Sequence, residues 1–199
     1  MAKKALLVGI TGASGSNYAL RFLQRLQQMD QPVEAIFSEV GKRVFEYETG
    51  VRVEEVSKLA RRIYDPSDFF SPPASGSSSY LGMVIIPCSM GTLSAIANGS
   101  SINLIHRAAD VMLKERKPLI LVVRETPLNL VHLENMLKVT KAGGIIYPAM
   151  PSFYAKPKTL DELIDQFIER LIQFLFAREN PYSWGNLLKE ENQAPSQIE

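Results

Sequence analysis

Charged side chains at helical spacing form the first candidate site in this sequence. Arg107, Asp110 and Lys114 recur at intervals of three and four residues, so on a helix they lie on one side. Apolar residues of the same stretch have the spacing of a buried helix face. Two cations beside a carboxylate can bind an anionic ligand, and they can equally form the solvated, salt-bridged face of an ordinary helix. Both interpretations are open at this point.

A buried strand is predicted directly after this helix. Pro118 ends the helical pattern, and residues 119–123 form an unbroken apolar run, which is typical of a strand covered on both faces of a parallel sheet. Arg124 and Glu125 follow the run, at the carboxyl end of the strand, where open α/β sheets bind their ligands. A fixed cation and a carboxylate at that edge indicate a site for an anionic ligand, or simply a charged strand end.

Two turns between a strand and a helix contain the small residues that an anion-binding turn needs. Thr-Gly-Ala-Ser-Gly-Ser at 11–16 follows the first apolar run, and Pro-Cys-Ser-Met-Gly-Thr at 87–92 follows a later one. Backbone N–H groups at such a helix start can bind a phosphate group, and two such turns at neighbouring strands would hold one ligand. The glycines of the first turn lack the Gly-x-Gly-x-x-Gly spacing of dinucleotide-binding proteins. The alternative is a tight turn in which Ser14 or Ser16 only caps the helix.

Two further segments could contribute to a site. Residues 65–79 are rich in Pro, Ser and Gly and are flanked by aromatic residues, a composition that favours a mobile loop able to cover a pocket. A capping box at 159–162 opens a long helix in which Arg170 lies beside the apolar stripe. Its guanidinium either extends along that stripe to solvent or pairs with an anion. Another helix is expected over 53–63.

Composition and length limit the fold and the partners. Apolar runs alternate with helical segments along the 199 residues, which predicts a doubly wound, mostly parallel α/β sheet in three αβα layers. We expect one domain over 1–178 and a polar tail over 179–199. A net charge of +1 gives no general attraction to nucleic acid or an anionic membrane, and no apolar run is long enough to span a bilayer. The single cysteine and the two histidines lack metal-ligand spacing, so no metal site is expected. The cytoplasm is the expected location.

The sequence resembles the flavin prenyltransferase family over about residues 4–178. The resemblance rests on Gly-Ile-Thr-Gly-Ala-Ser-Gly at 9–15, Pro-Pro-Ala-Ser-Gly-Ser-Ser at 72–78, Pro-Cys-Ser-Met-Gly-Thr at 87–92, Arg-Ala-Ala-Asp-Val-Met-Leu-Lys-Glu-Arg at 107–116, Arg-Glu-Thr-Pro at 124–127 and Phe-Tyr at 153–154. It implies a flavodoxin-like or Rossmann-like fold and a large homo-oligomer. Members of the family transfer a dimethylallyl group from dimethylallyl monophosphate to reduced FMN, forming bonds at flavin N5 and C6.

The resemblance also implies residue roles. Contacts with FMN correspond to Gly12, Ala13, Ser14, Ser38, Ser89, Met90, Gly91, Thr92 and Arg124. Contacts with dimethylallyl monophosphate correspond to Lys114, Tyr154 and Arg170, with Arg107 and Glu125 nearby. The expected catalytic set is Ser14 and Glu48, which match residues that handle a proton at flavin N5, together with Lys114 and Glu125. Phe69 stands where some members have a tryptophan. No Asp-rich magnesium motif is present, so protein cations alone would stabilise the departing phosphate.

The resemblance implies partners as well, and two alternatives remain. The expected recipient of prenylated FMN is a decarboxylase that depends on it, and the expected assembly is a dodecamer, in which the tail 179–199 is mobile or contacts other subunits. One alternative is a flavin-dependent cysteine decarboxylase of the same fold, but its catalytic histidine after the first flavin-binding turn has no counterpart before His106. The other is a non-catalytic flavin carrier, which would not need Lys114, Tyr154 and Arg170 around a second phosphate.

Overall fold

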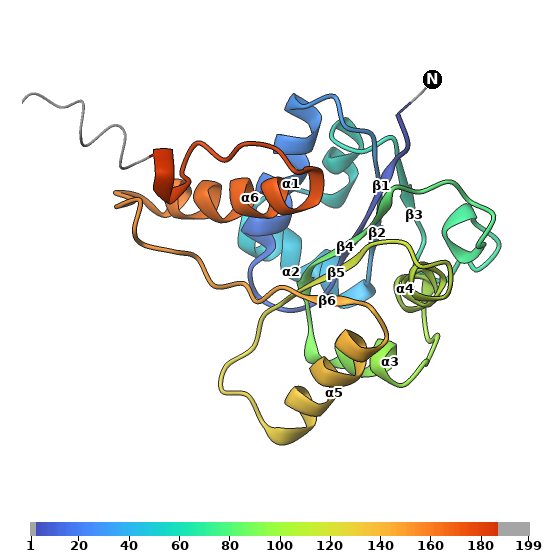
Figure 1. Ribbon diagram of the computed structural model, residues 1–199. Helices are drawn as coiled ribbons and strands as arrows, with labels where there is room; N and C mark the ends of the chain where they lie inside the picture. The colour runs from blue at the N-terminus through green and yellow to red at the C-terminus, as the bar shows by residue number, and fades with distance from the viewer. Residues whose placement is uncertain (1–2, 187–199) are drawn as a thin grey trace, which may run out of the picture. The chain divides into compact units, whose positions relative to one another are not determined.

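The structure is a computed structural model that describes residues 3–186. The chain divides into two compact units, Met1–Ala149 and Met150–Glu199. The first unit contains the sheet and the second a long helix (Figure 1). The single domain expected over 1–178 stays a prediction, and most of the tail expected over 179–199 lies outside the described residues.

A parallel sheet forms the centre of the first unit (Figure 1). Between residues 3 and 186 its six strands are β1 (Leu6–Ile10), β2 (Val33–Phe37), β3 (Arg62–Tyr64), β4 (Gly82–Cys88), β5 (Leu119–Val123) and β6 (Ile145–Ile146), in the spatial order β3-β2-β1-β4-β5-β6. All neighbouring pairs are parallel. The strand order reverses between β1 and β4, where a doubly wound sheet opens a crevice at the carboxyl ends of its strands. The predicted doubly wound parallel sheet is therefore confirmed.

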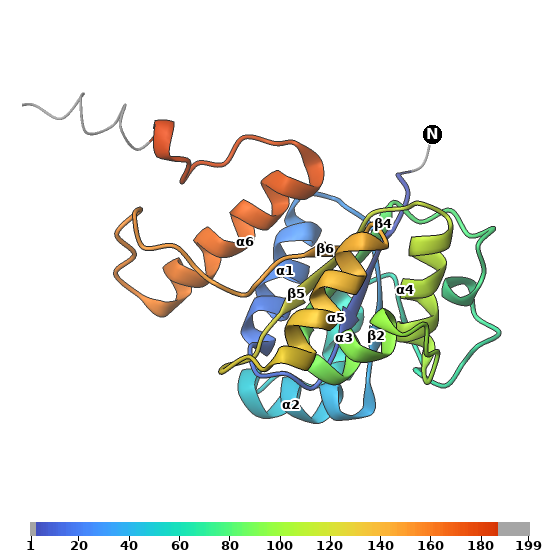
Figure 2. The same cartoon turned by 60° about the horizontal axis from the view of Figure 1, so that its bottom comes forward.

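Helices cover both faces of this sheet. They are α1 (Ser16–Gln28), α2 (Glu39–Thr49), α3 (Met90–Ala97), α4 (Leu104–Lys114) and α5 (Leu130–Lys141), with the short 3-10 helices η1 (Val53–Lys58) and η2 (Pro72–Ala74) between them. The first two lie on one face, and α3, α4 and α5 lie on the other (Figures 1 and 2). The helix expected over 53–63 was wrong in its second half. Arg62, Ile63 and Tyr64 instead pair with β2, because an isoleucine and a tyrosine suit a half-buried edge strand.

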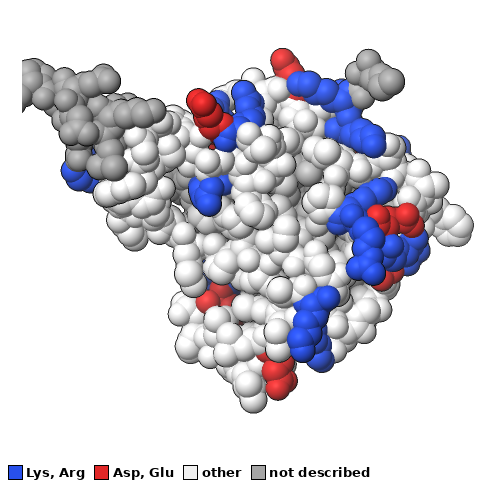
Figure 3. All heavy atoms as spheres, in the orientation of Figure 1, with Lys and Arg blue, Asp and Glu red and all other residues white. Residues whose placement is uncertain are grey.

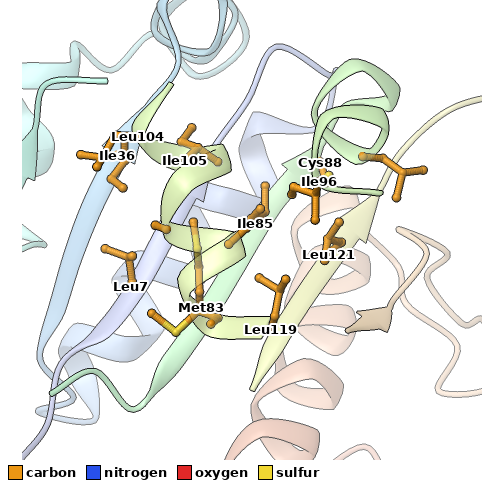
Figure 4. Packing of buried hydrophobic residues seen from close by; sticks show 14 of the residues in the cluster. Leu7, Ile36, Met83, Ile85, Cys88, Ile96, Leu104, Ile105, Leu119 and Leu121 are labelled. Atoms are coloured by element: carbon orange, nitrogen blue, oxygen red, sulfur yellow. The ribbon is translucent and has the colours of Figure 1, made fainter. Parts of the chain in front are cut away.

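Alternating side chains of the strands build a core on each face. On one face Leu7, Met83, Ile85, Leu119 and Leu121 of the strands form one buried cluster with residues of α3 and α4, among them Ile96, Leu104 and Ile105 (Figure 4). A Cβ on Gly9 would lie only 3.3 Å from Ile105 Cγ2, so α4 packs closely over β1. On the other face the ring of Phe37 meets Phe45 of α2 edge to face, with 5.3 Å between centroids. Strands covered on both faces give the turns at their carboxyl ends fixed starting points.

The second unit is built around α6 (Leu160–Phe176). Its first turn is capped by Thr159, whose hydroxyl accepts from the Glu162 N–H at 3.1 Å. The Glu162 carboxylate accepts from Lys158 N–H at 2.6 Å, so the return bond of the predicted capping box goes one residue further back. Among residues 3–186, no helix is long and apolar enough to cross a membrane.

Candidate active site

The turns after β1 and β4 lie side by side at the carboxyl edge of the sheet. Thr11, which is 1% exposed, donates its hydroxyl to the Pro87 carbonyl at 2.7 Å. The same oxygen accepts from the Ser89 N–H at 2.9 Å. The two turns therefore share a buried hydrogen-bonded link, and the predicted convergence at the reversal of strand order is confirmed.

The first turn already binds an anion, and that anion belongs to the chain itself. Glu48, near the end of α2, accepts from the N–H groups of Gly15 and Ser16 at 2.9 and 2.7 Å. These amides stand at the start of α1, where a phosphate was expected. The turn is therefore an anion site, as predicted, but its open end is filled by a carboxylate 33 residues away from Gly15 in the chain.

Hydrogen bonds determine the charge state of Glu48. Partial burial by itself raises the pKa of this carboxyl, but hydrogen bonds from the Ser14 side chain and from the Ser16 and Gly15 amides outweigh it, so the pKa lies below its ordinary value. Glu48 is consequently ionised at neutral pH. The structure thus brings together Ser14 and Glu48, the two residues expected to handle a proton.

Acidification should remove part of the stability that Glu48 provides. Its folded-state pKa lies below the unperturbed value of 4.5, so its contribution is complete above that pH and is lost as the pH falls through the lower folded-state pKa. We expect the melting temperature of the wild type to exceed that of Glu48→Gln at about pH 6, and the difference to shrink toward about pH 3. Differential scanning fluorimetry across this range measures it, and a difference that does not change with pH would contradict the expectation.

The second turn leaves its helix start open. Ser89 caps α3 by accepting from the Thr92 N–H at 3.3 Å, and its hydroxyl donates to Thr92 Oγ1 at 3.2 Å. The Met90 and Gly91 amides, in the first turn of α3, have no acceptor within the helix. A Cβ on Gly91 would meet no atom within 4 Å. This helix start can therefore receive an anionic or polar ligand group.

Cys88 ends β4 directly before this second turn. It is fully buried, and burial raises the pKa of its thiol well above the ordinary value. Because the thiolate is the reactive form of cysteine, Cys88 belongs to the core and supplies no covalent chemistry to the site.

Arg124 reaches the same region from the end of β5. Its N–H donates to the Cys88 carbonyl at 3.2 Å. Burial raises the pKa of Tyr18, on α1, and the Arg124 guanidinium offsets part of that rise. Tyr18 therefore lies near Arg124, although sequence reasoning gave it no role in a site. Its place in the first turn of the helix that follows the 11–16 turn was the signal that could have revealed it.

Ser38 borders a cavity next to the first turn. Its hydroxyl caps α2 by accepting from a backbone N–H at 3.0 Å. Val40, two residues later, packs against Gly12, where a Cβ would lie 2.5 Å from Val40 Cγ1; position 12 therefore requires glycine. A cavity of about 610 Å³ opens here, and its lining includes Ser38, Val40, Phe69 and Ile102.

Only the start of α4 lies at the edge of the sheet where the two turns are, so the charged residues of this helix do not all lie near the turns. Arg107 Nη1 pairs with Asp110 at 2.8 Å, and Lys114 pairs with Glu115. The start of α4 is tied to the carboxyl edge, since Leu104 N–H donates to the Pro66 carbonyl, just beyond β3. Its end leads to Pro118, whose carbonyl binds the first residues of β4, so Lys114 lies at the amino edge. Lys and Arg side chains gather with acidic ones over α4 (Figure 3).

The loop before β4 is attached to α4 rather than free. Arg107 Nε donates to the Ala74 carbonyl at 3.1 Å, and Lys117 Nζ donates to the Ser78 carbonyl at 2.6 Å. A Cβ on Gly76 would lie 2.6 Å from Lys114 Nζ. The composition of the segment favoured a mobile loop, but these bonds place its small residues against cations on α4 and just after its end.

The remaining expected residues are placed separately. Glu125 is exposed, and its carboxylate accepts from the Thr126 N–H at 2.9 Å. In the second unit, the Tyr154 ring meets Trp184 edge to face at 5.9 Å, and Arg170 donates to Gln173 one turn along α6. In the first unit, the structure therefore groups Gly12, Ala13, Ser14, Glu48, Ser89, Met90, Gly91, Thr92 and Arg124 around the reversal point, with Ser38 at the adjoining cavity.

The comparisons with known proteins identify the family of this chain. A family model described as Flavoprotein matches residues 1–172. Flavin prenyltransferase UbiX of Aquifex aeolicus is 47% identical over 177 residues, which cover 87% of this chain and 94% of that protein. The chain belongs to the flavin prenyltransferase family.

Solved structures of this family share the fold. The crystal structure of AnUbiX (PadA1) in complex with FMN and dimethylallyl pyrophosphate has a TM-score of 0.87 and 39% identity, covering 91% of this chain and 96% of that one. A dodecameric FMN-dependent UbiX-like decarboxylase from Escherichia coli O157:H7 has a TM-score of 0.85 and 39% identity, covering 90% and 97%. The expected family, with its three-layer parallel α/β fold, is therefore confirmed.

Proposed function

We propose that this chain is a flavin prenyltransferase that transfers a dimethylallyl group from dimethylallyl monophosphate to N5 and C6 of reduced FMN. One observation carries the proposal: the open start of α3 and the ionised Glu48 carboxylate with its Ser14 hydroxyl donor lie at the same crevice. The chain that contains them belongs to this family. The open helix start suits a flavin nucleotide, and the pair suits proton transfer at its ring.

The residues around the crevice fit FMN. The amides of Met90 and Gly91 have no acceptor within α3, the space beside Gly91 is clear, and Arg124 supplies a positive charge. We propose that FMN is bound by Gly12, Ala13, Ser14, Ser38, Ser89, Met90, Gly91, Thr92 and Arg124. When bound and reduced, the flavin supplies the nucleophilic ring atoms. The α1 amides cannot serve its phosphate, because Glu48 already occupies them.

Ser14 and Glu48 form the proposed proton path at N5. The Ser14 hydroxyl can donate to Glu48 and at the same time accept from a ring N–H group. Glu48 has several donors and a lowered pKa, so it holds and orients this hydroxyl more readily than it acts as a strong base. Glu125, exposed at the end of β5, and the released phosphate are the groups proposed to accept the proton from C6.

Protein cations would stabilise the phosphate as the allylic carbon–oxygen bond breaks. Within residues 3–186, no group of three or more His, Cys, Asp or Glu side chains could hold a metal ion. We propose that Tyr154, Arg170, Lys114 and Arg107 surround this phosphate. Aromatic surface next to it would stabilise the developing allylic cation.

Lys114 would have to act in the site of another copy of the chain. It lies at the amino edge of the sheet, whereas Ser14 and Glu48 lie at the carboxyl edge. Helix α4, with 11 residues, separates the two edges by about 16 Å. We therefore propose that Lys114 completes the active site of a neighbouring subunit in a homo-oligomer, with a dodecamer as the expected size.

An exposed apolar face supports this assembly. Leucine and valine side chains on and before α5 lie open to solvent in the single chain: Leu128, Leu130, Val131, Leu133 and Leu137. Soluble monomers rarely expose such a contiguous apolar patch, so we propose that a second copy covers it. The proposed recipient of the product, a decarboxylase dependent on prenylated FMN, rests on the family resemblance, as does the expected cytoplasmic location.

The test is an anaerobic incubation of the protein with reduced FMN and dimethylallyl monophosphate. We expect mass spectrometry of the extracted flavin to show FMN heavier by one prenyl unit. A parallel reaction with dimethylallyl pyrophosphate is included, because the AnUbiX structure contains that compound. Unmodified FMN in both reactions would favour a flavin carrier. Because the Escherichia coli relative is called a decarboxylase, carbon dioxide release from a cysteine-terminated peptide or an aromatic acid is measured alongside.

A further inference from the structure

The backbone ladder between β1 and β4 ends before the active-site turns begin. The two strands pair from Leu6 opposite Gly82 to Gly9 opposite Ile85, and the register of β4 on β5 shifts between Ile85 and Cys88. Pro87 lies in this interval and has no N–H group to donate. Something other than the ladder must therefore fix the turn after β4 relative to the turn after β1.

The Thr11 side chain supplies that link. Its hydroxyl donates to the Pro87 carbonyl at 2.7 Å and accepts from the Ser89 N–H at 2.9 Å, both ordinary hydrogen-bond lengths. The side chain is 1% exposed, so water does not compete for these bonds. A β-branched side chain has few rotamers, which keeps the oxygen in place between the two turns.

The Thr11 link affects the proposed flavin site through Ser89, which donates its N–H to the Thr11 hydroxyl oxygen. Ser89 caps α3, and the open amides of Met90 and Gly91 follow it directly. Thr11 is followed directly by Gly12, Ala13 and Ser14, the other half of the site. The hydroxyl of Thr11 therefore fixes the distance between two sets of groups that must contact the same ligand, although Thr11 itself is covered by protein.

We infer that Thr11 is a positioning residue that holds the two halves of the flavin site in register. The inference rests on the proposed function for the identity of the ligand. Without this link the Pro87 carbonyl and the Ser89 N–H lose their shared partner and the two halves are no longer preorganised, so flavin binding should weaken beyond the effect on folding.

The test compares FMN affinity in matched variants of the flavin-stripped protein. Thr11→Val keeps the shape of the side chain and removes both bonds, and Thr11→Ser keeps the hydroxyl. We expect Thr11→Val to raise the Kd for FMN about tenfold or more, measured by quenching of flavin fluorescence, and Thr11→Ser to restore it to within about threefold of the wild type. Should Thr11→Val fail to fold, Thr11→Cys, with its weakly hydrogen-bonding thiol, takes its place with the same expectation.

A second core variant separates positioning from general stability. Val33 starts β2 at the opposite edge of the sheet and is 1% exposed, so Val33→Ala should lower the melting temperature while leaving the Kd for FMN unchanged. Unchanged FMN affinity in Thr11→Val, a loss that Thr11→Ser does not rescue, or an equal loss in Val33→Ala would each overturn the inference. These outcomes are independent of prenyl transfer, so wild-type protein that binds FMN and forms no prenylated product would count against the proposed function alone.

Discussion

Replacing Glu48 with glutamine should lower the rate of FMN prenylation by about 100-fold or more, while the protein still binds FMN. The glutamine has nearly the same size but no charge, and its amide nitrogen cannot accept a hydrogen bond. The N–H groups of Gly15 and Ser16 and the hydroxyl of Ser14 all depend on this carboxylate. The variant would therefore leave Ser14 without a fixed orientation at the flavin.

Glu46 offers a matched control on the same helix. Its carboxylate also accepts from a backbone N–H, that of Val53 at 3.1 Å, but this bond joins α2 to η1 rather than to the first turn. Glu46→Gln therefore removes one charge and weakens one amide contact without touching Ser14. We expect it to prenylate FMN at nearly the wild-type rate. Single-turnover mass spectrometry compares the variants, and equal rates for Glu48→Gln and the wild type would exclude the proposed proton path.

Two variants that are inactive alone should restore activity when they share an oligomer. Glu48→Gln damages the carboxyl edge of its own chain, and Lys114→Ala removes a cation that we assign to the site of a neighbour. In randomly mixed oligomers, about a quarter of the sites would combine an intact Glu48 with an intact Lys114 from the next copy. Co-expression with two different tags, followed by purification on both, would yield such oligomers for the prenylation assay.

A second pair provides the control for this experiment. Ser14→Ala and Glu48→Gln affect groups that contact each other within one chain, so no mixture of these two variants creates an intact site. We expect no recovery from this pair. If verified mixed oligomers of Lys114→Ala and Glu48→Gln likewise remained inactive, Lys114 and Glu48 would have to serve the same chain, and the proposed assembly of the site would be wrong.

Features set by neighbouring residues could be predicted from the sequence. The turns at 11–16 and 87–92 follow directly from apolar runs that end in small residues, and the sheet brings them together because both strands are parallel and adjacent. The pairing of Arg107 with Asp110 also followed from helical spacing. In these cases the pattern and the structural constraint extend over the same few residues.

Features set by contacts between residues far apart in the chain could not be predicted from local sequence patterns. The residues around Glu48 do not distinguish it from any surface glutamate, so only the family resemblance pointed to it, and its contact with Gly15 comes from the packing of α2 beside the first turn. The loop over 65–79 has the composition of a linker, but Arg107 attaches it to α4 and Lys117 to the segment just after that helix. Helical spacing indicated the face on which Lys114 lies, and its place just before Pro118, where the next strand begins, was the unused signal that puts it at the amino edge of the sheet.

The burial of Cys88 has a consequence for work in air. Reduced flavins react with oxygen to form peroxide, and a cysteine beside them is exposed to that oxidant whenever turnover stalls. Oxidation to sulfenic acid requires an accessible thiolate, whereas Cys88 has no exposed surface and a raised pKa. Aerobic purification should therefore leave this sulfur unoxidised, and a loss of activity in air would have to arise elsewhere, such as from reoxidation of the flavin or oxidation of the exposed Met150.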